Sequence, residues 1–84
     1  MTERAKPTIP YPELLKKVQG ILAFFPEECR NVHIDNLEVY REQVDGANWH
    51  VATYRCSGDD NDLVECKEKL VMKLRALRDS YDVA

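Results

Sequence analysis

Apolar residues recur at helical spacing in two separate stretches of the chain. In the first stretch, from Pro12 to Phe25, they fall one, three or four positions apart and so share one face of a helix. Pro12 suits the first turn, where its missing N–H would have no intrahelical partner. Pro26 is expected to end the helix, because proline removes a donor and disfavours helical geometry in the preceding residue. The pattern predicts an amphipathic helix between these two prolines.

A longer apolar stripe lies near the end of the chain. The polar run from Ser57 to Asp62 comes before it and has the residues of a loop followed by a helix cap. Acidic residues gather at the start of this stretch and basic residues toward its end, which stabilises a helix through its dipole. An ion pair at four-residue spacing is expected between Arg75 and Asp79. The stripe comprises Leu63, Cys66, Leu70, Leu74, Leu77 and Tyr81, widened on one side by Val71.

Between these predicted helices the pattern changes to an alternation rich in β-branched and aromatic residues. Residues 32–42 and 48–56 predict two strands, and Asp45-Gly46 between them is a hairpin signal. The alternation slips once, and an extra residue near Asp35 and Asn36 would explain the slip as a β-bulge. The expected fold class is therefore α+β, in the order α-β-β-α, with an antiparallel hairpin packed with two amphipathic helices.

The length of the hairpin loop decides the strand register. A three-residue loop, Val44-Asp45-Gly46, would pair Val39 with Val51. This register turns one set of residues toward the helices: Leu37, Val39, Trp49 and Val51. The other face then carries Glu38, Tyr40, Glu42, His50, Ala52 and Tyr54. A two- or four-residue loop would exchange the faces, because one residue of slip moves every side chain to the opposite side.

The length of 84 residues fits a single domain, which we place at residues 11–84. Residues 1–10 contain charged side chains and two prolines, and they predict a flexible N-terminal tail. The sequence has no apolar run of the roughly 20 residues needed to cross a bilayer and opens without one, so neither a membrane span nor a signal peptide is expected. With a net charge of −3 the chain as a whole repels a polyanion, so nucleic-acid binding is not expected.

Three cysteines at wide spacing, Cys29, Cys56 and Cys66, do not suggest a disulfide framework. Reduced thiols and a cytoplasmic location are the simpler expectation. Cys29 and Cys56 with the two histidines, His33 and His50, could supply zinc ligands, but no Cys-x-x-Cys pair anchors such a site. The acidic run 59–62 lacks the glycine and glutamate positions of a calcium loop. We therefore expect no metal, no cofactor and no catalytic residues.

A bare two-stranded hairpin has two unpaired edges, and something should cover them. The face predicted to point outward carries the candidate partner-binding residues Glu38, Tyr40, His50 and Tyr54, since aromatic residues with polar tips are favoured at interfaces. The sequence thus favours a small protein-interaction module that binds itself, with a four-stranded sheet across a dimer, or another protein. If the helices took opposite faces, the fold would close alone. The pattern also fits an accessory or regulatory subunit with a small ligand between hairpin and second helix near Trp49, or a weak nucleic-acid adaptor.

Overall fold

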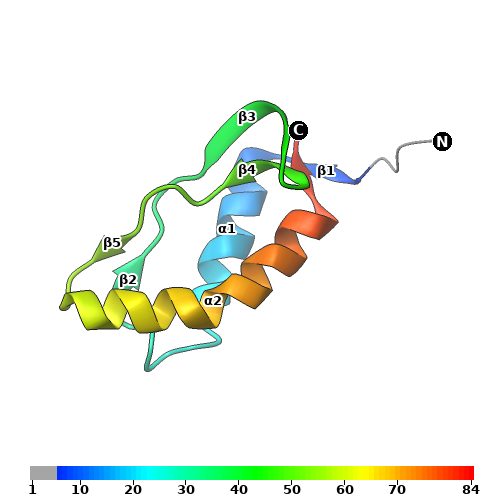
Figure 1. Ribbon diagram of the computed structural model, residues 1–84. Helices are drawn as coiled ribbons and strands as arrows, with labels where there is room; N and C mark the ends of the chain where they lie inside the picture. Colours follow the sequence, from blue (N-terminus) through cyan, green and yellow to red (C-terminus); the bar gives the residue numbers. More distant parts are fainter. Residues whose placement is uncertain (1–5) are drawn as a thin grey trace.

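Two helices and a long hairpin between them make up the structure, a computed structural model that describes residues 6–84 (Figure 1). This arrangement confirms the predicted α+β class and the order helix, hairpin, helix. The elements are β1 (Thr8–Ile9), α1 (Tyr11–Leu22), β2 (Val32–His33), β3 (Glu38–Val44), β4 (Ala47–His50), β5 (Arg55–Cys56), α2 (Asp60–Ser80) and β6 (Asp82–Val83).

The first helix, α1, is shorter than the prolines at its ends suggest. It ends at Leu22, four positions before Pro26, and the N–H groups of residues 23–25 then bond to carbonyls three positions back. Such bonds tighten the end of a helix and satisfy its last carbonyls. Phe25, the last residue of the predicted apolar face, still packs partly against the core, whereas its neighbour Phe24 is 66% exposed. The side chains buried by α1 are Leu14, Val18 and Ile21.

The second helix, α2, begins as predicted. The carboxylate of Asp59 accepts a hydrogen bond from the N–H of Asp62 at 3.3 Å and so caps the first turn. Cys66 and Leu70 of the predicted stripe are fully buried, whereas Val71 is 58% exposed and does not widen it. Neither helix within residues 6–84 has the length and apolar composition that spanning a membrane would require.

The hairpin is one antiparallel ribbon with an interruption. Val32 pairs with Cys56 at one end and Val39 with Trp49 further along, and the same register holds on both sides of the unpaired segments 34–37 and 51–54. Equal numbers of residues are therefore unpaired on both strands, and the predicted bulge near residues 35 and 36 is wrong. Ile34 is buried before the interruption and Leu37 after it. Ile34 and Leu37 can both face the core, although they are three positions apart, because the ribbon turns along the unpaired segment between them. This turn explains the slip in the alternation of apolar residues.

A two-residue turn closes the ribbon. Val44 pairs with Ala47, and the turn residues Asp45 and Gly46 have φ of 54° and 89°. Two consecutive positive φ values are typical of the tight hairpin turn that matches strand twist. The predicted three-residue loop is wrong, and Val39 pairs with Trp49 rather than with Val51.

The two ends of the described chain meet beside the hairpin. Thr8–Ile9 pairs in parallel with Asp82–Val83, so β1 stands where the sequence predicted part of a flexible tail. The Lys6 ammonium lies 3.2 Å from the Asp82 carboxylate. Residues 1–5 of the predicted tail lie outside the described residues. Strands as short as β1 and β6 carry no periodic signal, which explains why the sequence did not reveal them.

The core lies between the helices and the ribbon, with Trp49 as its largest fully buried side chain. The indole N–H of Trp49 donates to the Tyr81 carbonyl at 3.0 Å, so its polar atom is satisfied. Cys66 packs in the core as predicted, but it forms a disulfide with Cys29. The prediction of three reduced thiols is therefore wrong for this pair, because the loop after α1 folds back against α2. Cys56 is free.

Candidate functional site

The outer edge of β3 is the open edge of the ribbon. On the other side of the ribbon, the Asn48 side chain joins β4 to β6: its amide donates to the Val83 carbonyl at 3.1 Å and accepts from the Val83 N–H at 2.9 Å. Asn48 thus substitutes for a backbone ladder between these strands. Within residues 6–84, β3 pairs with β4 alone. The outer edge of β3, the longest strand, is therefore open to a partner strand.

Asp82 secures the same corner of the molecule. Its carboxylate accepts hydrogen bonds from the Gln43 amide at 2.7 Å and from the Asn48 N–H at 3.1 Å, and it contacts the Lys6 ammonium. Burial acts to raise the pKa of Asp82, but these donors outweigh it and hold the pKa below its ordinary value. The charged carboxylate therefore stabilises the junction of β3, β4 and the chain ends.

Two valines on the inner side of β3 are not covered by the helices. Because residues paired in antiparallel strands share a face, Val39 lies on the side of Trp49, and Val44 on the side of Ala47. Trp49 and Ala47 are fully buried, whereas Val39 is 45% exposed and Val44 47%. Figure 1 shows β3 arching away from both helices. We refer to Val39, Val44 and the open edge of β3 as the β3 overhang.

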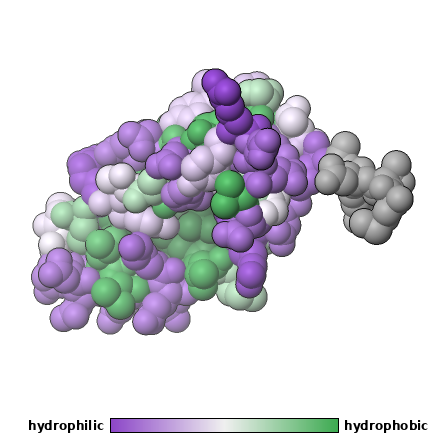
Figure 2. All heavy atoms as spheres, turned by 45° about the horizontal axis from the view of Figure 1, so that its top comes forward, coloured by the Kyte–Doolittle hydropathy of each residue, from purple (hydrophilic) through white to green (hydrophobic). Residues whose placement is uncertain are grey.

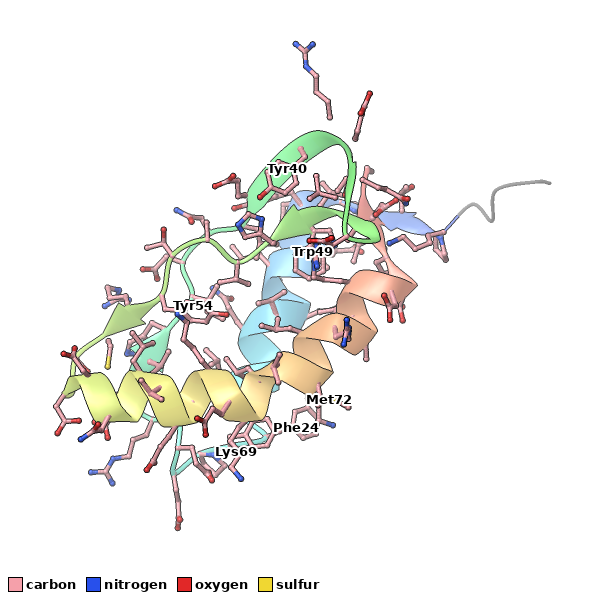
Figure 3. The ribbon with its side chains drawn as sticks, in the orientation of Figure 1. Phe24, Tyr40, Trp49, Tyr54, Lys69 and Met72 are labelled. Carbon is pink, nitrogen blue, oxygen red and sulfur yellow. A yellow bond between two sulfur atoms is a disulfide. The ribbon has the colours of Figure 1, made fainter. Side chains whose placement is uncertain are left out.

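Three of the four predicted partner-binding residues lie together on the outer face of the hairpin. Glu38 is the cross-strand partner of His50. The Tyr40 hydroxyl is hydrogen-bonded to the His50 imidazole, and the centres of the two rings are 5.1 Å apart (Figure 3). The helices cover the opposite face, which carries Trp49. Glu38, Tyr40 and His50 therefore form a polar and aromatic patch behind the β3 overhang.

Tyr54, the fourth predicted residue, lies elsewhere. It belongs to the unpaired segment 51–54, and the Lys67 ammonium of α2 lies 4.9 Å from the centre of its ring. In Figure 3 the Tyr54 side chain projects toward α2. Burial raises the pKa of the Tyr54 phenol, so the hydroxyl remains a hydrogen-bond donor at neutral pH. The prediction is wrong in joining Tyr54 to the outer face, because the ribbon turns between His50 and Tyr54.

A cavity of about 840 Å³ separates this part of the ribbon from α2. β4 ends at His50 and β5 begins only at Arg55, so the segment that faces α2 across the cavity has no paired strand. Figure 2 shows apolar side chains low in a recess on this face, with polar side chains along its rims. The cavity is open to solvent on one side. Its lining residues are Asp45, Tyr54, Lys67, Val71, Leu74, Arg75, Arg78 and Asp79.

Positive charge predominates along the α2 side of this cavity. Arg78 is held in place by two carbonyls: its Nε donates to Trp49 at 2.9 Å and an Nη to Val44 at 2.7 Å. The predicted ion pair between Arg75 and Asp79 does not form. The sequence pattern assigned Arg78 only to the basic residues toward the end of the predicted helix. Its acceptors are backbone carbonyls far away in sequence, and no sequence signal marks such contacts.

The four residues considered as zinc ligands are not brought together. Cys29 is bound to Cys66, and across residues 6–84 no three His, Cys, Asp or Glu side chains are placed to hold one metal ion. Comparison of the chain with protein-family models, with curated proteins and with solved structures gave no match. Function must therefore be argued from the β3 overhang and the cavity themselves.

Proposed function

We propose that this protein is an interaction module that forms a homodimer through the β3 overhang. The observation that carries the proposal is the exposure of Val39 and Val44 on the core side of β3, a strand whose outer edge has no partner within residues 6–84. A second copy placed against this edge would continue the hairpin into a four-stranded sheet and cover both valines.

The charges of β3 fit pairing with its own copy. This strand carries both signs, with Glu38 and Glu42 against Arg41. A strand with both signs of charge avoids the repulsion that a strand of one sign would meet in its own copy. The register of β3 is irregular between Val39 and Val44, and such irregularities bend a strand and increase its twist, so the partner strand must match this local shape. The cytoplasmic location expected from the sequence stays a prediction.

Sedimentation equilibrium at several protein concentrations tests the proposal. We expect a monomer–dimer equilibrium for the full chain and weaker association for Val39→Glu and Val44→Glu, because each change introduces a charge where an apolar contact forms. Val64→Glu is the matched control: Val64 is 53% exposed but lies on α2. A chain that is monomeric at every concentration would contradict the proposal.

The position of the interface can be tested separately. Tyr40→Glu alters the outer face of the hairpin and leaves the two valines in place. If the valines form the contact, this variant should associate nearly as well as the original chain. Association that is lost in Tyr40→Glu and unchanged in Val39→Glu would instead place the interface on the outer face, and the β3 overhang would be excluded.

A further inference from the structure

The cavity between α2 and segment 51–54 combines an apolar floor with unpaired cations. Val71 is 58% exposed on the helix side, and Leu74 of the next turn packs only partly into the core. Lys67 and Arg75 stand four positions before and after Val71, so all three lie on one face of α2. An apolar surface is thus flanked by two long basic side chains.

These cations have no carboxylate partner within residues 6–84. The ion pairs found in the described part of the chain join Lys6 to Asp82 and Arg55 to Asp35, and none of these residues lines the cavity. Lys67 contacts the face of the Tyr54 ring, which is uncharged. Arg78 is bound to neutral carbonyl oxygens, so its full charge acts on the cavity from a fixed position.

The two acidic lining residues gather at one end. Asp45 lies in the hairpin turn, and the Asp79 carboxylate lies beside Gly46 of the same turn. Lys67 is twelve positions before Asp79, or about 18 Å away along the helix. Both carboxylates therefore lie at the turn end of the cavity, together with Arg78, which is bonded to the Val44 carbonyl. Lys67 lies at the opposite end, beside Tyr54.

We propose that this cavity binds a small amphiphilic anion, in which a carboxylate or phosphate head group is attached to an apolar body. The head group lies at the rim between Lys67 and Arg75, away from Asp45 and Asp79. The body covers Val71 and Leu74. A volume of about 840 Å³ is within the usual range for small-molecule sites. Arg78 needs no reordering on binding, which lowers the entropic cost.

Matched ligands can separate the role of the head group from that of the body. Octanoate, octyl phosphate, neutral octanol and inorganic phosphate are titrated into the ¹⁵N-labelled full chain, below the concentrations at which micelles form. We expect either or both of the first two to shift the amide signals of Tyr54, Lys67, Val71 and Arg75 saturably. Equal binding of octanol, equal binding of inorganic phosphate, or no saturable shift at these residues would each overturn the proposal.

Two charge reversals on α2 test the location. Arg75→Glu should weaken binding of whichever anion binds by at least about tenfold, since it replaces a charge-assisted contact with repulsion. Lys69→Glu makes the same change of charge, but Figure 3 shows Lys69 beside Phe24 and Met72 on the side of α2 turned away from the hairpin. It should bind as the original chain does. Equal weakening in both variants would show a general charge effect and overturn the proposal.

The ligand site does not depend on the proposed dimer. Val39→Glu should lose self-association and keep the affinity for the anion, because Val39 does not line the cavity. Measuring both properties on this variant and on Arg75→Glu separates the two proposals, and either can fail alone.

Discussion

Reduction of the Cys29–Cys66 disulfide is expected to lower the free energy of unfolding by about 4 kcal/mol. The bond joins residues 37 positions apart. In the chain-entropy description, closing a loop of this length removes about 13 cal/mol/K from the unfolded ensemble, or about 4 kcal/mol at 25 °C. A domain of 84 residues has a total stability of roughly 4–13 kcal/mol. The cross-link therefore accounts for a large share of that stability.

The packing around the two sulfur atoms should survive reduction. Cys29 is 3% exposed and Cys66 fully buried, and a buried thiol packs as a small apolar group. The expected loss is thus mainly that of the cross-link. With a shift of about 4–8 °C for each kcal/mol in a domain of this size, the reduced protein should melt about 15–30 °C below the oxidised one.

Urea and thermal unfolding, with and without dithiothreitol, measure this difference. Circular dichroism reports the helices, and Trp49 fluorescence reports the core. Cys56→Ala is the control, since Cys56 is free and its loss should leave the difference between oxidised and reduced protein unchanged. Alkylation of the denatured, unreduced chain should label Cys56 alone. If all three cysteines are labelled, or the two forms unfold within about 1 kcal/mol of each other, the reasoning is refuted.

Four further substitutions test the fold by chemical denaturation. Leu70→Ala should cost about 2–5 kcal/mol because Leu70 is fully buried, whereas Met72→Ala, at a site 73% exposed on the same helix, should change stability by less than about 0.5 kcal/mol. Asn48→Ala should cost about 1–3 kcal/mol, since it leaves the N–H and C=O of Val83 without their partner. The lowered pKa of Asp82 means that its contribution is present above the ordinary value of 3.8 and is lost as pH falls through the folded-state value. Asp82→Asn should flatten the stability–pH curve below about pH 4, and an unchanged curve would remove Asp82 as its cause.

The sequence predicted best the elements whose signals are local. The cap at Asp59 and the long stripe through Cys66 and Leu70 specify α2 without reference to the rest of the chain. Asp45-Gly46 predicted a turn, but its length depended on whether Asp45 adopts positive φ, which aspartate tolerates without requiring it. The disulfide depended on a tertiary approach of two distant segments, which spacing along the chain does not contain.

The candidate site shows the same division. Glu38, Tyr40 and His50 lie on the outer face because simple alternation carries that information. Tyr54 departs from them because both strands turn together between β4 and β5, and only the paired structure reveals this turn. The exposure of Val39 was missed because it depends on how far the helices reach beneath an edge strand.

The irregularity in β3 explains why the predicted faces are right although the predicted loop is wrong. A regular ladder continued from the Val44–Ala47 pair would place Glu42 opposite Trp49 and direct its carboxylate into the core. Instead, β3 advances five positions from Val39 to Val44 while β4 advances two from Ala47 to Trp49. The extra residues return Val39 to the face of Trp49 and carry Glu42 out of the ladder. Burial of Trp49 thus requires a longer β3, and a longer β3 extends past the helices. The exposed edge is a consequence of packing the core, so a Val39 variant that still buries Trp49 reports on the edge alone.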